Sequence, residues 1–280
     1  MTEQDLLLPE TLAPLVKHTI FAGHIHYWPE VESTNSLALQ AAALGSRETE
    51  AGEGTVFLAD AQTAGRGRGG HSWHSEHGSG IYASFLLRPE IAPAHILWLS
   101  LISAIAVQDA VQEATGLTAD IRWPNDLLLE GKKFCGILTE ASSDSSRVQY
   151  AVVGIGINVN HAAFPESLSP IATSLRMVRG AVVPRVPLAA SLIRCFDRNY
   201  RILLKAGTIP EDLSGRQFKP IMEKLTGRSS YIHGKLVQVI EEDGYSGVTD
   251  GLDSRGFLRV RTEHGLRTVI SGSVRPLITD

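Results

Sequence analysis

The chain has 280 residues, of which 43% are hydrophobic and 20% are charged. This composition is typical of a globular protein with one large domain, or with one domain and a smaller one. The formal net charge of −4 argues against a general nucleic-acid binder, which usually carries a basic excess. Cys135 and Cys195 form no CxxC pair and no cysteine–histidine cluster, so a structural zinc site built on cysteines is not expected.

The N-terminal stretch MTEQDLLLPETLAPLV contains acidic residues where a secretory signal needs positive charge. No unbroken apolar run approaches the ~18 residues that a membrane span requires. We therefore expect a cytoplasmic protein with no membrane partner.

The first part of the chain predicts strands that alternate with a helix. HIHYWPEV (24–31) alternates in polarity and predicts a strand, and STNSLALQAAALG (33–45) predicts a helix that ends at Gly45. Ser33, Thr34 or Asn35 can supply the oxygen that caps this helix. TVFLADAQ (55–62) predicts a strand that leads directly into the loop AGRGRGGHSW (64–73).

The middle of the chain predicts a sheet covered by an apolar helix. IYASFLLRP (81–89) predicts a strand, and 93–116 predicts a helix from Pro93 to Gly116 that is apolar over most of its surface and should lie under the sheet. DIRWPNDLLLEGKKFCGILTEAS (120–142) predicts strands joined by turns, with a hairpin turn at Glu130–Gly131. RVQYAVVGIGINVN (147–160) predicts a further strand, almost wholly apolar, whose middle is buried on both faces.

The pattern changes near residue 225. VPLAASLIRCFDRNYRILLKAG (186–207) predicts an amphipathic helix, and a shorter helix follows to about Leu225. From about Gly227 onward, short strands are separated by glycine-containing turns, which is typical of a small β-barrel. We therefore predict one domain over residues 1–225 and a small β domain over 226–280.

The loop AGRGRGGHSW is open to three interpretations from its own residues. Glycine lets the backbone approach a ligand closely, and guanidinium groups suit carboxylate and phosphate oxygens, so the loop can bind an anion. It can equally be a flexible turn. The third interpretation, an RGG-type tether in an RNA-binding module, is disfavoured because there is one copy, joined to a strand, in an acidic protein.

Two later motifs also have both a structural and a functional interpretation. RWPND (122–126) can be a turn capped by its own Asn and Asp side chains, or it can bring Asp126 close to Lys132 and Lys133 in a charged site. GIGINVN (154–160) can be a tightly packed strand, in which case Asn158 needs a hydrogen-bond partner that a ligand could provide.

The combination of these motifs in this order is much more specific than any one of them. STN, then GRGR, WPNDLL, K-x-x-G-I-L and G-x-G-I-N resemble the biotin protein ligases, the biotin–[acetyl-CoA-carboxylase] ligases, from about His26 to Asn160. SGSVRPL near the C-terminus resembles the final strand of that family. A lipoate or octanoate ligase of the same fold is the alternative.

The resemblance implies an α+β fold, with a mixed-sheet catalytic domain followed by a small SH3-like β-barrel. It also implies a two-step reaction. The carboxylate of biotin attacks the α-phosphate of Mg-ATP to give biotinyl-5′-AMP and pyrophosphate. A specific lysine of a biotin carboxyl carrier domain then attacks this mixed anhydride.

The resemblance also assigns roles to residues. Arg68, Lys133 and Asp126 are the expected catalytic residues, and Asp126 would either assist Mg²⁺ or accept hydrogen bonds from the incoming lysine. Trp73 would stack on adenine or pack in the core. The expected biotin-binding residues are Ser33, Thr34, Asn35, Gln62, Arg66, Gly67, Arg68, Lys133, Gly136 and Gly154. The expected ATP-binding residues are Arg68, Trp73, Asn125, Lys133 and Asn158.

The sequence departs from the family pattern at Gly69 and His71, where relatives often carry basic residues. We therefore predict a loosely held phosphate end that becomes ordered when ligand binds. About thirty residues precede STN, which is too few for the winged helix-turn-helix of the bifunctional members, so we expect a monofunctional ligase that binds no operator DNA. Family members can pair through edge strands, so we also consider a homodimer.

Overall fold

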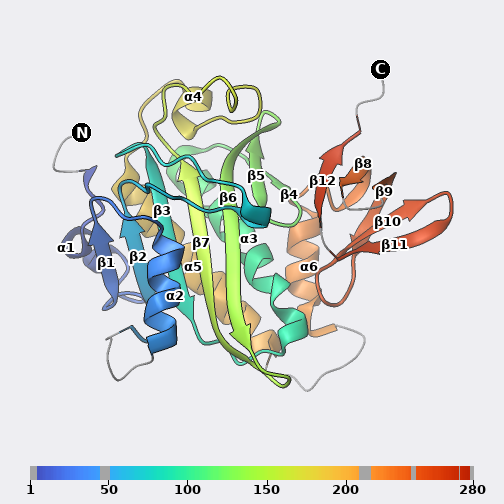
Figure 1. Ribbon diagram of the computed structural model, residues 1–280, viewed down its shortest axis with the longest axis horizontal. Helices are drawn as coiled ribbons and strands as arrows, with labels where there is room; N and C mark the ends of the chain where they lie inside the picture. Colours follow the sequence, from blue (N-terminus) through green and yellow to red (C-terminus); the bar gives the residue numbers. More distant parts are fainter. Residues whose placement is uncertain (1–4, 45–50, 208–215, 241–243, 271, 278–280) are drawn as a thin grey trace.

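The computed structural model describes residues 5–44, 51–207, 216–240, 244–270 and 272–277, and it places helices on both faces of a seven-stranded sheet (Figure 1). A five-stranded sheet lies beside this layered body. In order across the larger sheet, the strands are β1 (Ile25–Trp28), β2 (Thr55–Ala59), β3 (Gly80–Leu87), β7 (Val148–Asn158), β6 (Lys132–Ser143), β5 (Asp126–Leu129) and β4 (Asp120–Arg122).

The larger sheet is mixed, as predicted. β1 and β2 are parallel, and every other neighbouring pair is antiparallel. Every residue of β2 and β3 is buried, because helices cover both faces of these strands. The predicted hairpin joins β5 to β6, and its turn residues Glu130 and Gly131 have φ values of 50° and 77°. A two-residue turn with two positive φ values matches the twist of antiparallel strands.

One face of the sheet carries a single helix, α2 (Thr34–Leu44). Ser33 acts as its N-cap, since the Ser36 amide donates to Ser33 Oγ at 3.4 Å. Ala38 and Ala42 of the helix pack on a small apolar cluster with Phe57 of β2. The predicted end at Gly45 lies outside the described residues.

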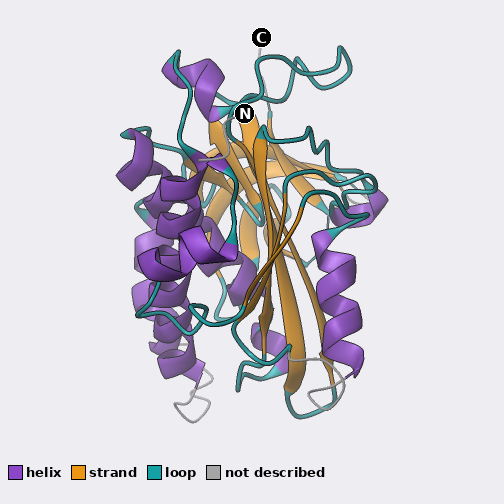
Figure 2. Ribbon diagram, turned by 90° about the vertical axis from the view of Figure 1, so that its left-hand side faces the viewer, coloured by secondary structure: helices purple, strands orange, loops and turns teal. Residues whose placement is uncertain are grey.

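The other face carries α3 (Leu97–Thr115) and α5 (Arg185–Gly207), which Figure 2 shows on the side of the sheet opposite α2. A 3₁₀ turn, η4 (Pro93–His95), precedes α3, and Gly116 ends it in the left-handed conformation at φ 76°. Pro93–Thr115 is long and apolar enough to cross a membrane, although it contains no unbroken apolar run of that length. In the fold, 78% of its most apolar window is buried, as expected of a core helix.

Short elements complete this body. Residues 5–24 contain a four-residue helix and one 3₁₀ turn, and their buried side chains Leu7, Leu12 and Phe21 join the main core. The short helices and 3₁₀ turns of the whole body are α1 (Pro9–Leu12), η2 (Ala13–Leu15), η3 (Arg68–Gly70), α4 (Leu175–Arg179), η5 (Arg216–Phe218) and α6 (Lys219–Thr226).

The C-terminal strands form a separate antiparallel sheet, which fits the predicted small barrel-like unit. Its strands lie in the order β11 (Gly265–Val269), β10 (Leu258–Thr262), β9 (Tyr245–Leu252), β8 (His233–Ile240) and β12 (Ser273–Pro276). Helix α6 ends at Thr226, next to the predicted boundary, but residues 226–280 as an independent domain remain a prediction.

Two tryptophan side chains of the larger body, one on α3 and one between β4 and β5, donate hydrogen bonds to the turn between β9 and β10. Trp98 Nε1 on α3 donates to the Ser254 carbonyl at 3.2 Å, and Trp123 Nε1 donates to the Gly256 carbonyl at 3.0 Å. Gly256 has φ 89°, which favours glycine, and a Cβ there would lie 2.9 Å from Leu101 Cδ1. The turn between β9 and β10 is therefore fixed against α3.

A buried ionic network ties the N-terminal segment to the sheet. The Arg185 side chain is fully buried and forms ion pairs with Asp60 at 2.7 Å and Asp5 at 3.2 Å. It also donates to the Gly80 carbonyl, and Tyr27 Oη donates to Asp60 at 2.6 Å. The Asp60 side chain is fully buried as well, so its charge depends on these partners.

We expect Arg185→Ala to lower the free energy of unfolding by about 3–5 kcal/mol, because it leaves the Asp60 carboxylate buried without its counter-ion. Urea denaturation followed by circular dichroism measures this change. Arg179→Ala, which removes an exposed arginine, is the matched control and should leave stability nearly unchanged. A loss below about 1 kcal/mol for Arg185→Ala, in the range of an exposed ion pair, would contradict this role.

Candidate active site

A cavity opens on the α2 face of the large sheet, between the start of α2, the arginine-containing loop and the centres of β6 and β7. It gathers segments from five separate parts of the sequence. Its lining comprises Ser33, Thr34, Asn35, Gln62, Arg66, Gly67, Arg68, Trp73, Tyr82, Ala83, Asn125, Lys133, Gly136, Ile137, Leu138, Gly154, Ile155 and Gly156. All predicted site residues are in this set except Asp126 and Asn158.

Neutral polar groups form a hydrogen-bonded chain where α2 meets the sheet. The backbone amide and hydroxyl of Thr34 both donate to Gln62 Oε1, at 2.9 and 3.2 Å. Ser84 Oγ lies 2.8 Å from Thr34 Oγ1 and 2.6 Å from Asn35 Oδ1. Because Ser33 provides the helix cap, the side chains of Thr34 and Asn35 remain available to this polar chain.

Asn35 connects this polar chain to strand β6. Its Nδ2 donates to the Leu138 carbonyl at 3.3 Å and to Glu140 Oε2 at 3.0 Å. The other carboxylate oxygen of Glu140 accepts from Arg66 at 2.7 Å. Arg66 is therefore paired with a carboxylate and adds little net positive charge to the cavity.

The loop after β2 is a compact turn rather than an irregular tether. The Gly67 amide donates to the His71 carbonyl at 2.7 Å, and the His71 amide donates back to the Arg68 carbonyl at 3.3 Å. Gly69 has φ 63°, a left-handed conformation that favours glycine over a basic residue. This conformation gives a physical reason for the departure from the family pattern at Gly69.

Arg68 reaches from this turn across to the β4–β5 connection. Its Nη1 donates to Asn125 Oδ1 at 3.3 Å, and Asn125 Nδ2 donates to the Ile137 carbonyl at 2.9 Å. Burial lowers the pKa of Arg68 below its ordinary value, and the nearby Asp126 carboxylate partly opposes this shift. Arginine is not deprotonated in proteins, so the guanidinium stays charged.

Lys133 lies in the same part of the cavity and is held by Asp126. Its Nζ is 2.6 Å from Asp126 Oδ1 and 5.3 Å from the centre of the Trp73 ring. Asp126 Oδ2 is also paired, with Arg122 at 2.7 Å. One carboxylate thus faces three cationic groups, Arg68, Arg122 and Lys133, and this end of the cavity carries excess positive charge.

Asp126 does not fit a protein-held Mg²⁺ site, because ion pairs with Lys133 and Arg122 already engage both of its oxygens. Asn158, the other predicted residue outside the cavity, is buried, and its Nδ2 donates to the Thr173 carbonyl at 3.1 Å. The Thr173 carbonyl is therefore the partner of Asn158, for which an interaction with ATP was predicted.

Three glycines create the floor of the cavity. Gly136 of β6 and Gly156 of β7 are directly paired, and the Trp73 indole lies over both. A Cβ at Gly136 would lie 2.8 Å from this ring, and one at Gly156 would lie 2.6 Å from it. Trp73 Nε1 is buried and has no hydrogen-bond partner in the described part of the chain, so it remains a free donor.

Gly154 provides the space for Asn35. A Cβ at Gly154 would lie 2.1 Å from Asn35 Oδ1, and Asn35 is held on three sides by its hydrogen bonds. Tyr82, Ser84 and Gly156 were not predicted as site residues. They occupy alternate or register-paired strand positions that face the cavity, and only the strand periodicity could have indicated them.

Comparisons with known proteins agree with this architecture. Residues 28–158 match the model of the biotin/lipoate A/B protein ligase family. The chain is 34% identical to the bifunctional ligase/repressor BirA of Bacillus subtilis, over 92% of this chain and 76% of that protein. It is 33% identical to the biotin–[acetyl-CoA-carboxylase] ligase of Mycobacterium tuberculosis, over 69% of this chain and 72% of that one. The structure of a biotin protein ligase from Aquifex aeolicus in complex with biotin and ATP superposes with a TM-score of 0.74 at 30% identity, and covers 91% of this chain and all of that one.

We expect Gly154→Ala to destabilise the protein by about 1–3 kcal/mol, the usual cost of overpacking, because Asn35 cannot move without losing its hydrogen bonds. Thermal unfolding measures the effect. Gly23→Ala is the matched control, since a Cβ there meets nothing within 4 Å. Equal melting temperatures for the two variants would show that the space at Gly154 is not required.

Proposed function

The chain belongs to the biotin/lipoate A/B protein ligase family, and we propose on that basis that it activates biotin with ATP and transfers it to a lysine of a biotin carboxyl carrier domain. The observation that carries the proposal is the division of the cavity. Neutral donors and acceptors gather near Gly154, and unbalanced cations gather near Gly136.

The neutral end suits the ureido ring of biotin. That ring has N–H donors and a carbonyl acceptor, and Thr34, Asn35 and Gln62 offer hydroxyl and carboxamide groups. A lipoyl or octanoyl chain is apolar and has no donor or acceptor with which these groups could exchange hydrogen bonds. A site built to hydrogen-bond its substrate rejects an analogue that lacks those bonds.

The cationic end suits the first step of the reaction. A carboxylate oxygen of biotin forms a bond to the α-phosphorus of ATP, the bond from that phosphorus to the β-phosphate oxygen breaks, and pyrophosphate leaves. Both reactants are anionic, so they repel each other before the reaction, and negative charge gathers at phosphorus during it. Arg68 and Lys133 are fixed cations that offset this charge, and such preorganised groups lower the barrier.

In the second step, the amine of the carrier lysine attacks the acyl carbon of biotinyl-5′-AMP, and AMP leaves with the bonding electrons. The amine must first lose a proton, because its reference pKa is near 10.4. Asp126 is paired with Lys133 and Arg122, which supports a positioning role for Asp126 on Lys133 rather than Mg²⁺ binding. We propose that Mg²⁺ enters with the phosphates of ATP, as is common for this ion.

Adenine recognition by Trp73 remains part of the proposal. The indole lines the cavity over Gly136 and Gly156, and its buried Nε1 has no hydrogen-bond partner in the described residues. The RNA-binding alternative is disfavoured because Arg66 is paired with Glu140 and the loop is closed by backbone hydrogen bonds.

We propose a cytoplasmic location and a pairing surface from the cysteines and the sheet edge. The two buried free thiols, Cys135 and Cys195, are consistent with a cytoplasmic protein. Residues 5–24 form short elements whose buried side chains pack on the main core. β1 is an edge strand on which a homodimer could form.

We expect Arg68→Ala and Lys133→Ala each to lower the rate of carrier biotinylation by roughly 10²–10³-fold, the effect of removing one preorganised charge-stabilising group. The assay supplies biotin, Mg-ATP and a purified carrier domain and follows biotinylated carrier over time. Lys132→Ala is the matched control, because Lys132 is exposed, lies outside the cavity lining and donates from Nζ to the Ser169 carbonyl. Wild-type rates for both test variants would overturn the site assignment.

Substrate choice has a separate test. With Mg-ATP and no carrier, we expect biotin to drive pyrophosphate release at least about 10²-fold faster than lipoate or octanoate, because only biotin pairs with the neutral polar groups. Equal or faster release with either fatty acid would assign the chain to the other branch of the family.

A further inference from the structure

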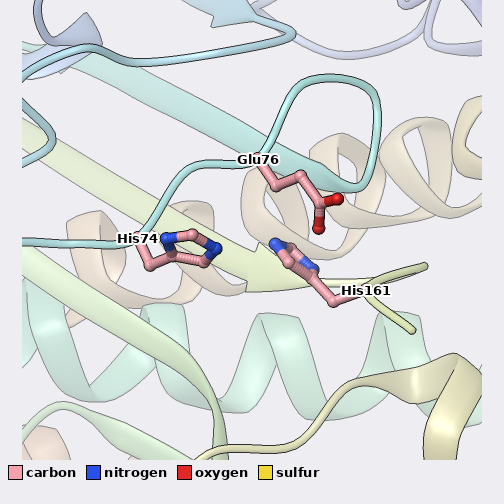
Figure 3. Close-up of side chains that lie close together, drawn as sticks. All are labelled: His74, Glu76 and His161. Atoms are coloured by element: carbon pink, nitrogen blue, oxygen red, sulfur yellow. The ribbon is translucent and has the colours of Figure 1, made fainter. Parts of the chain in front are cut away.

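Three potential metal ligands converge beside the cavity, outside the residues used above. His74 and Glu76 lie between the arginine turn and β3, and His161 follows β7 directly. Figure 3 shows their side chains pointing toward one another, and their ligand atoms all lie within 4.8 Å of each other.

His161 is the buried member of this group. The residue is fully buried, and its Nδ1 has no hydrogen-bond partner in the described residues. Its ring stacks on Phe164 with centroids 5.1 Å apart, and its Nε2 lies 3.5 Å from Tyr82 Oη. An unsatisfied buried polar atom needs a physical explanation, and a lone histidine in a core normally has a partner.

We propose that His74, Glu76 and His161 form a binding site for a divalent transition-metal ion of the Zn²⁺ type. Two imidazoles and one carboxylate are a donor set that such ions prefer, and three protein ligands leave one position of a tetrahedron for water. Ligand atoms in a tetrahedral zinc site lie about 3.4 Å apart, so small rotations of His74 and Glu76 would close the site. The site differs from that of Mg²⁺, which selects oxygen ligands.

The position of the ion indicates a structural role. It would join the segment that directly follows Trp73 to the end of β7, the strand that carries Gly154 and Gly156. Tyr82 reinforces the connection, because its hydroxyl donates to the Glu76 carbonyl at 3.0 Å while its side chain lines the cavity. Bound metal therefore fixes the wall of the cavity behind the indole.

The test uses the full chain without nucleotide or Mg²⁺ and takes Co²⁺ as a spectroscopic probe, with Zn²⁺ as competitor. We expect one equivalent of Co²⁺ to give visible d–d absorption that Zn²⁺ abolishes. Glu76→Gln and His74→Ala should each raise the Kd for Zn²⁺ at least about tenfold, since even indirect partners of metal ligands have effects of this size. His77→Ala, one residue beyond Glu76 and outside the cluster, is the matched control and should bind like the wild type.

A second measurement makes the result independent of any folding defect. Zn²⁺ should raise the melting temperature of the wild type and of His77→Ala, and should not raise that of Glu76→Gln, which keeps the shape of the side chain. The proposal is overturned if the wild type gives no d–d absorption, if Glu76→Gln and His74→Ala bind as tightly as the wild type, or if His77→Ala weakens binding to the same extent.

Discussion

Two neighbouring strands at the centre of the sheet lack side chains where they pair, and the cavity depends on this constraint. Gly136 and Gly156 face each other across β6 and β7, and Gly154 follows on the same face. The space that they leave is filled by groups from elsewhere in the chain, the Trp73 indole and the Asn35 carboxamide. A methyl group at any of the three positions would clash with one of these groups, so the site requires glycine at all three.

The cations of the cavity and the buried cation of the core are neutralised to different extents. Asp126 pairs with Lys133 and Arg122, which fixes the ammonium group and still leaves cations in excess. Arg185, in contrast, is fully buried and has carboxylate partners in Asp60 and Asp5. The Arg185 network supports the fold, whereas the cations around Asp126 leave a positive potential for an anionic ligand.

Local patterns allowed much of the fold to be predicted, because each depends on nearby residues. The end of α3 at Gly116, the hairpin at Glu130–Gly131 and the cap at the start of α2 follow from backbone preferences that act over a few residues. The ordered set of motifs also indicated the family, and most residues of the cavity came from those motifs.

The remaining features depend on contacts between distant residues, and no local pattern encodes them. The carbonyl of Thr173 satisfies Asn158, and Ser84 joins the polar chain only because β3 lies beside β7. The pairing of Asp126 with two cations likewise requires the turn between β4 and β5 to bring Arg122 back beside it. The apolar character of α3 indicated burial but could not separate a core helix from a membrane span without its surroundings.

The pairing of β3 with β7 has a consequence for how the molecule folds. Leu87 pairs with Ala151, and the chain between them, roughly 60 residues, supplies α3 and the three strands β4, β5 and β6. Closing so long a segment costs chain entropy before its contacts are gained, so topologies of this kind fold slowly. The cavity takes residues from before, within and after this segment, so a chain in which β3 and β7 have not yet paired lacks the complete site. Ligand affinity therefore appears only with the completed sheet, and a ligand stabilises the finished fold without guiding the earlier steps.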